Sequence, residues 1–184
     1  LAISLGHSII EPLPALVQLK SNAPFLKEWH GIRSDVSVSL LENNKTISAQ
    51  IGEIQLTDYG VSGICIFCLS GQVSRGLYQN NQEQISINFL YPFSINSKEE
   101  FITWMNSRNL KVLNRSVSDL LDGCINYKLI NLILKLSKID RNLIWNDLSI
   151  KQKEVLGNNF TNFILNITGI CYLIFCCFVN VAVW

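Results

Sequence analysis

The sequence predicts an α+β fold in which a β-barrel-like antiparallel part is followed by a small helical bundle. Between residues 35 and 90, apolar and polar residues alternate in short runs, which is typical of half-buried strands. After Tyr91-Pro92 the apolar residues recur at helical spacing instead. Because strands and helices are segregated along the chain rather than alternating, the pattern disfavours a doubly wound parallel sheet.

The first two strands are expected to form a hairpin. Asp35–Leu41 alternates valine and leucine with serine and predicts a strand, and a second strand is predicted from Thr46 to about Thr57. The polar residues 42–45 between them contain two asparagines, which tolerate the positive φ of a tight turn. Gln84–Leu90 predicts a third strand, with its isoleucines and Phe89 on one face.

Two local features lie between the hairpin and the third strand. The apolar positions of the second strand change parity between Ile51 and Ile54, so we expect a β-bulge at Gly52-Glu53 that restores the buried face. Val61–Leu77 predicts a short helix capped by Ser62.

The helical part is marked by N-terminal capping sequences. Ser97–Glu100 and Ser116–Asp119 are predicted capping boxes, and Ser149–Gln152 begins a last helix that we expect to stop at Gly157. The clearest amphipathic stripe lies between the second and third of these signals, at Ile125, Leu129, Leu132, Ile133 and Leu136.

Composition excludes some classes of function. The chain has 184 residues, 48% of them hydrophobic and 16% charged, which provides enough apolar surface for a folded core. Fifteen basic against fourteen acidic residues give a net charge of +1, so nucleic-acid binding is not expected. Residues 1–20 have no basic region and contain Pro12 and Pro14, which disfavours a signal peptide, and we expect a cytoplasmic protein.

Few residues suggest chemistry directly. Cys65 and Cys68 form a CxxC, but no second pair of ligands follows at usable spacing, so burial in the core is preferred to zinc or thiol redox chemistry and no metal site is expected. The histidines, His7 and His30, have no nearby nucleophile or carboxylate partner in the sequence, which favours a structural or surface role. Thr57–Gly63 is either a tight turn or a strand-to-helix junction that offers backbone N–H groups to an anion, with equal weight.

Several motifs in fixed order resemble one family. They are Leu5-Gly-His-Ser-Ile9, Leu13-Pro-Ala-Leu-Val-Gln-Leu19, the run from Gly52 to Gly63, Leu69-Ser70 and Val73-Ser-Arg75. Together they resemble the bacterial BaiN/YhiN-type flavoproteins, also described as aminoacetone oxidase-like or NAD(P)/FAD-dependent oxidoreductases. The resemblance is good from residue 1 to about 92 and looser to about 168.

The resemblance implies that the chain is the insert of a split Rossmann-type FAD-binding domain. It implies residues 1–20 as the end of the first flavin-domain half and its connector, 21–92 as a β-rich subdomain, 93–157 as a helical subdomain, and 158–169 as a strand that closes the insert. FAD and a small-molecule substrate would be bound with the rest of the flavoprotein as partner. Thr57, Tyr59 and Ser62 are the residues we expect to face flavin or substrate, while the catalytic residues are not identified.

The chain itself lacks a Gly-x-Gly-x-x-Gly or Walker motif, so we do not expect it to bind FAD tightly. The parent would be an FAD-dependent oxidoreductase that moves a hydride between FAD and a nicotinamide or organic substrate. The alternative is a non-catalytic protein-binding module, with or without a C-terminal membrane anchor.

Residues 170–184 depart from the family pattern. No Asp, Glu, Lys or Arg follows Glu154, and the apolar run 163–184 is long enough to suggest a transmembrane helix. Asn166, Gly169 and Asn180 interrupt it and no basic residue flanks it, so a reading-frame artefact is preferred to a membrane segment. The chain also does not begin with Met, and we expect it to start inside a longer reading frame.

Overall fold

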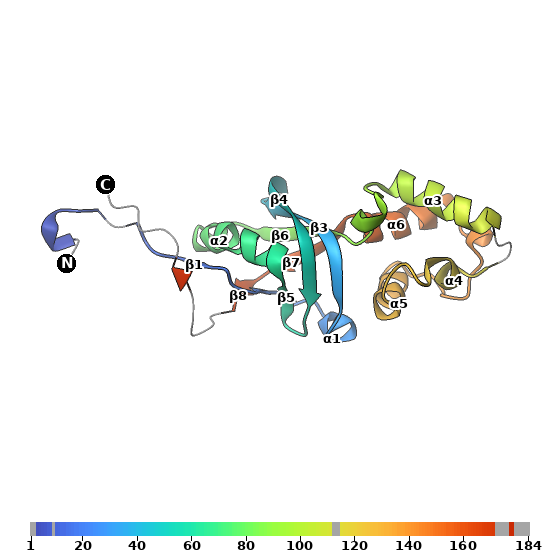
Figure 1. Ribbon diagram of the computed structural model, residues 1–184, viewed down its shortest axis with the longest axis horizontal. Helices are drawn as coiled ribbons and strands as arrows, with labels where there is room; N and C mark the ends of the chain where they lie inside the picture. Colours follow the sequence, from blue (N-terminus) through green and yellow to red (C-terminus); the bar gives the residue numbers. More distant parts are fainter. Residues whose placement is uncertain (1–2, 9, 112–114, 172–176, 179–184) are drawn as a thin grey trace.

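A computed structural model describes residues 3–8, 10–111, 115–171 and 177–178 of the chain. Figure 1 shows a strand-rich part around helix α2 and, beside it, a helical part. The strands are β1 (Pro14–Ala15), β2 (Leu19–Lys20), β3 (Arg33–Glu42), β4 (Lys45–Leu56), β5 (Gly60–Ser62), β6 (Glu83–Asn88), β7 (Phe163–Ile167), β8 (Gly169–Ile170) and β9 (Cys177–Phe178). The expected order, strands first and helices second, is confirmed.

The main sheet has seven strands in the order β7-β6-β3-β4-β5-β2-β8, and every pairing in it is antiparallel. Its two edge strands, β7 and β8, are separated in sequence only by Thr168. The segment Phe163–Ile170 therefore pairs with β6 through its first half and with β2 through its second. One continuous stretch of chain joins both edges, which gives the sheet its barrel-like closure.

The inner face of the sheet packs on α2 (Ile64–Tyr78). Alternate residues of β3, β4 and β6 are fully buried, as period-2 patterning predicts: Val36, Val38, Leu40, Ile54, Leu56, Ile85 and Ile87. From the helix, Cys65, Ile66, Leu69 and Val73 meet them. The short helix α1 (Leu26–Trp29) belongs to the same core, where Phe163 makes edge-on contacts with Phe25 and Phe89.

The β3–β4 hairpin forms as predicted, but the expected bulge at Gly52-Glu53 is wrong. Pairing is regular from Arg33↔Gln55 to Leu40↔Ser48, and the register shifts only at Leu41↔Thr46, which leaves Ile47 as the extra residue. The parity change has another cause. The apolar residues of the first half of β4 lie on the outer face, where Ile47 is 47% and Ile51 is 60% exposed, whereas Ile54 and Leu56 lie on the inner face.

The turn residues Asn43 and Asn44 adopt positive φ of 49° and 65°, as expected.

The helix after the hairpin starts later than predicted. Ser62 lies in β5, paired with Gln55, and the N-cap of α2 is Gly63, whose φ of 109° turns the strand into the helix without a side-chain cap. A serine in this position could not reach the helix, because its backbone is already committed to the sheet.

The helical part consists of α3 (Lys98–Lys111), α4 (Val117–Leu121), α5 (Tyr127–Leu136) and α6 (Ile150–Thr161), with the 3-10 turns η2 (Tyr91–Phe93) and η3 (Trp145–Asp147). Ser97, Ser116 and Ser149 each accept a hydrogen bond from the backbone N–H three residues on, so all three serines cap helices as expected. The complete capping box is at Ser149, where the Gln152 side chain also accepts from the Ser149 N–H. Phe101 stacks on Phe160 at 5.6 Å between ring centroids and ties α3 to α6.

The predicted end of the last helix at Gly157 is wrong, because α6 continues to Thr161. An added Cβ at Gly157 would lie 2.9 Å from the Phe101 ring and 3.1 Å from the Lys98 Cα. This glycine therefore allows α3 and α6 to approach closely and does not terminate the helix.

The connector before the sheet contains the 3-10 turn η1 (Ile3–Leu5) and β1, and β1 pairs with β9. The closing strand expected over 158–169 is found from Phe163 on, but residues 158–161 belong to α6. It also does not end at Gly169, because Ile170 is in β8 and the Cys171 N–H donates to the Gln18 carbonyl at 2.9 Å. The suggested transmembrane helix over 163–184 is wrong for Phe163–Ile170, because this segment forms strands β7 and β8. Residues 172–176 and 179–184 of the suggested helix lie outside the described part of the chain. Within the described residues, no helix has the length and apolarity to cross a membrane.

Candidate functional site

The three residues expected to face flavin or substrate lie around the turn from β4 into β5. Thr57 and Ser62 are buried, with 4% and 3% of their surface exposed, and Tyr59 between them is half-buried. The Thr57 carbonyl accepts a hydrogen bond from the Trp29 indole at 2.9 Å, which fixes the turn to α1. Of the three side chains, that of Tyr59 is the one with access to the surface.

Tyr59 is held against β2. Its hydroxyl donates to the Gln18 side chain at 2.5 Å, and its backbone carbonyl accepts a hydrogen bond from the Ser21 N–H. Burial raises the pKa of the Tyr59 phenol, so the group is neutral near pH 7 and acts as a hydrogen-bond donor. Tyr59 is therefore a hydrogen-bond donor that is held in a fixed orientation by Gln18, and it does not serve as a general base near pH 7.

The glycines of the same segment are required by close packing between strands. A Cβ at Gly60 would lie 2.1 Å from the Leu19 carbonyl oxygen, and one at Gly63 would lie 2.4 Å from the Glu53 carbonyl oxygen. Both residues also have φ values in the region that favours glycine, 151° and 109°. The glycine pattern of Thr57–Gly63 is therefore explained by a tight turn between adjacent strands.

The packing around Gly63 bears on whether the β5–α2 junction could hold the pyrophosphate of FAD. A Rossmann site needs a glycine-rich strand-to-helix turn open to the pyrophosphate at the helix N-terminus. At the β5–α2 junction, the space beside Gly63 is filled by the backbone of β4. Gly63 therefore serves the close packing of β4 against the start of α2, and its missing side chain does not leave an open space for a ligand.

The cysteine pair divides between two environments. Cys65 is buried and its thiol donates to the Glu53 carbonyl at 3.4 Å; burial raises its pKa to about 11. Cys68 is exposed one turn later on α2, so the expectation of a core position is confirmed for Cys65 and wrong for Cys68. Among the described residues, no group of three or more His, Cys, Asp and Glu side chains is arranged to hold a metal ion.

His30 is a surface residue, as expected, and lies 3.9 Å from the Asp58 carboxylate with both side chains more than half exposed. Exposed ion pairs of this kind contribute little to stability. The geometry of this pair is that of a solvent-exposed contact between His30 and Asp58.

The hollows on the described surface include one that is apolar and one that is polar. One, of about 530 Å³, lies between the connector and the outward side of α2 and is lined mainly by apolar groups, including Leu13, Leu16, Phe67 and Tyr78. The other, of about 460 Å³, is polar and lies where the outer sheet face meets α3 and α6, lined by Ser37, Ser39, Ser86, Asn96, Asn158 and Asn162 among others. The sequence did not reveal either one, because each combines residues that are far apart along the chain.

Residues 13–172 match the model of a family described as "HI0933-like protein barrel and H2TH domain". The chain belongs to this family. The match spans both the closed sheet and the helices, and it confirms the resemblance to the BaiN/YhiN-type flavoproteins.

The chain is also similar to the 3-dehydro-bile acid delta(4,6)-reductase of Clostridium scindens. The two are 34% identical over 158 residues, which are 85% of this chain but 37% of that protein. The similarity thus covers one domain of a larger oxidoreductase.

Proposed function

We propose that this chain is the insert of a split Rossmann-type FAD-binding domain, and that it covers the flavin and substrate site of an FAD-dependent oxidoreductase. The observation that carries the proposal is the family match over residues 13–172, supported by the 34% identity with a reductase. In such a protein, FAD supplies the hydride chemistry, and the insert contributes orientation and exclusion of water.

The geometry supports a covering role rather than a nucleotide-binding one. The sheet closes on itself through Phe163–Ile170 and is filled by α2, so it is a rigid body able to present surface side chains at fixed positions. Tyr59 is our candidate for a group facing the flavin or substrate, because it is oriented by Gln18 and keeps surface access. Thr57 and Ser62 would support it from behind.

The parent would transfer a hydride between FAD and a nicotinamide or an organic substrate. The test is to read the coding sequence on both sides of the chain and to purify the longer protein that it encodes. We expect a glycine-rich strand–turn–helix upstream and a bound flavin, visible in the absorption spectrum. A longer protein that purifies folded, without flavin and unable to take it up, would rule the proposal out.

Tyr59→Phe in that longer protein provides a finer test. Removing the hydroxyl should lower kcat/KM by roughly 5-fold if it contacts the reacting groups, since one lost hydrogen bond in a site costs about 1 kcal/mol. The control is Tyr127→Phe, which removes a hydroxyl from a tyrosine of α5 that is 63% exposed. Equal activity of both variants would remove Tyr59 from the site.

A further inference from the structure

We infer that the outward side of α2 and the connector beside it form the surface on which the flavin-binding part of the larger protein docks. We call this surface the α2 groove and define it by Leu13, Leu16, Phe67, Cys68, Arg75 and Tyr78. The inference rests on the proposed function and adds to it the face of the insert that meets the flavin-binding part.

The first argument is that α2 is apolar on two sides. Its inward side is buried in the barrel through Cys65, Ile66 and Leu69. Its outward side presents Phe67 and the exposed Ile64, which is 68% accessible. The polar residues Gln72, Arg75 and Gln79 also line the hollow, so the outward side presents apolar groups within a polar frame, which is typical of an interaction surface.

The second argument is the hollow itself. It has a volume of about 530 Å³, and its apolar walls come from two elements, the connector and α2. Leu16 in the connector remains 54% exposed and holds a φ of 57°, a conformation uncommon for leucine. Exposed apolar patches that are framed by polar groups mark protein interaction sites, and here Arg75 stands at the helix side of the patch.

The third argument identifies the occupant. The matched region begins at residue 13 and ends at residue 172, and more than half of the Clostridium scindens reductase lies outside its match. Gln18, near the beginning of this region, and Cys171, at its end, are joined by a backbone hydrogen bond. The remainder of a family protein therefore connects to the domain at two adjacent points.

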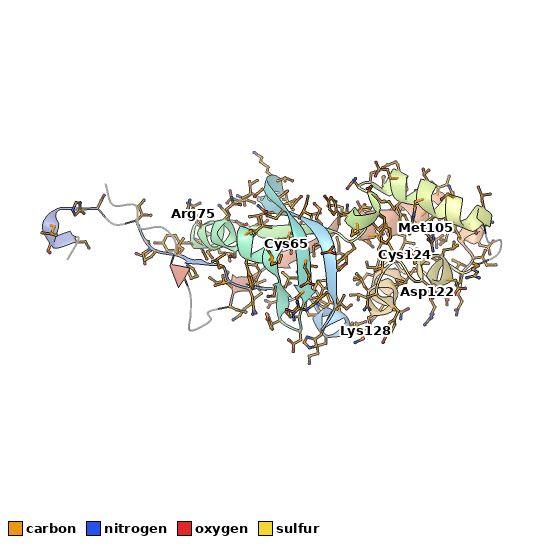
Figure 2. All side chains as sticks on the ribbon, in the orientation of Figure 1. Cys65, Arg75, Met105, Asp122, Cys124 and Lys128 are labelled. Atoms are coloured by element: carbon orange, nitrogen blue, oxygen red, sulfur yellow. The ribbon has the colours of Figure 1, made fainter. Side chains whose placement is uncertain are left out.

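Those two points lie beside the groove. β1 packs on α2, where a Cβ at Gly71 would lie 3.5 Å from the Ala15 Cβ. Figure 1 shows β1 and β9 at the α2 end of the molecule, far from α4 and α5. Figure 2 shows Arg75 at this same end and Cys124 in the helical part at the other. A flavin-binding part attached here would lie next to the α2 groove.

The exposed Cys68 lies in the groove and reports on its accessibility. The experiment compares the rate of alkylation of Cys68 by iodoacetamide in this chain and in the longer protein, measured by peptide mass spectrometry. We expect the rate to fall at least 10-fold in the longer protein. Cys124, in the helical part, is the internal control and should react at the same rate in both.

A matched pair of variants in the longer protein completes the test. Leu16→Glu places a charge in the groove and should restore Cys68 labelling, whereas Leu110→Glu, at a leucine of α3 that is 76% exposed, should leave Cys68 protected. A flavin-containing protein in which Cys68 reacts as fast as in this chain would overturn the docking face while leaving the proposed function intact.

Two other results are equally decisive. A longer protein that protects Cys68 but holds no flavin would refute the proposed function and also overturn the inference that the part covering the groove binds flavin. Protection of Cys68 in this chain alone that increases with protein concentration would assign the groove to a second copy and overturn the inference.

Discussion

At the scale of single residues, the most unusual feature is a pair of carboxyl groups under α2. Glu83 on β6 lies opposite Glu42 on β3, is only 2% exposed, and receives no hydrogen bond from another described residue. Gly76 makes room for it, because a Cβ there would lie 1.7 Å from Glu83 Oε1. Burial and the neighbouring Glu42 raise the pKa of Glu83 to about 7, so the protonated acid can donate to Glu42.

This pair predicts how stability depends on pH. An unfolded glutamate titrates near 4.5, whereas the folded Glu83 holds its proton up to about 7, so the folded state binds more protons between these values. The stabilisation is therefore fully present below about pH 4.5 and is lost as the pH rises through about 7. We expect the free energy of unfolding to fall by on the order of 1–3 kcal/mol from pH 5 to pH 8 from this group alone.

Glu83→Gln should remove most of this dependence and stabilise the chain at pH 8, because a neutral amide replaces a buried charge. The measurement is chemical denaturation at pH 5, 6, 7 and 8. Glu99→Gln, at an exposed glutamate of α3, is the control and should leave the pH profile unchanged. A Glu83→Gln variant with the native profile would show that Glu83 does not titrate in this range.

At the scale of helices and strands, the sequence predicted those features that depend on residues close together along the chain, such as helix N-caps. Side-chain caps at Ser97, Ser116 and Ser149 formed because each oxygen reaches an N–H three residues away. Positions set by neighbouring elements were not predictable in this way. The parity change in β4 arises because the apolar residues of its first half lie on the exposed outer face and those of its second half lie on the buried inner face. Gly157 is a glycine because α3 packs closely against it. In both cases the deciding residues lie elsewhere in the chain.

Two helical glycines provide a test of this difference. Gly157→Ala forces a Cβ against Phe101 and the Lys98 backbone, and we expect it to destabilise the chain by about 1–3 kcal/mol despite the gain in helix propensity. Gly71→Ala meets only the Ala15 Cβ at 3.5 Å, an ordinary contact, and should stabilise α2 by up to about 1 kcal/mol. Thermal unfolding of both variants at one pH measures the contrast, and equal effects would contradict the packing explanation.

At the scale of the whole molecule, the decisive feature is that one segment closes the sheet. The resemblance implied a closing strand over 158–169. It did not imply that the two halves of Phe163–Ile170 pair with opposite edges, because β6 and β2 are distant from this segment in sequence. The same holds for the candidate site. Thr57, Tyr59 and Ser62 came from a resemblance, and only the fold separates the two buried side chains from the accessible tyrosine.

The fold also makes a prediction about cofactor binding by this chain alone. The sequence of this chain contains no Gly-x-Gly-x-x-Gly or Walker motif, and at the β5–α2 junction the backbone of β4 occupies the Cβ position of Gly63. Titration with FAD, followed by flavin fluorescence or calorimetry, should therefore show a Kd weaker than about 100 μM, or no binding. Micromolar or tighter binding would contradict this, and a longer protein that contains the glycine-rich turn is the positive control.

The last prediction concerns how much of the C-terminal segment the fold requires. Ile170 is buried and pairs with Leu19, and Cys171 donates to Gln18, so closure of the sheet extends to residue 171. Beyond it, the described contact with the rest of the chain is the short β1–β9 pairing. We therefore expect deletion of residues 172–184 to keep the unfolding midpoint within about 5 °C of the full chain, a change of roughly 1–2 kcal/mol at this size.

Deletion of residues 170–184 is the matched comparison. It removes β8 and the buried Ile170, whose burial contributes about 1.5–3 kcal/mol, and should lower the midpoint by more than about 5 °C. The shorter deletion should also raise the soluble yield, because it removes an apolar segment without charged residues, a composition prone to β-aggregation when exposed. If both deletions lowered the midpoint equally, residues 172–184 would be an integral part of the barrel, and their interpretation as a reading-frame artefact would have to be abandoned.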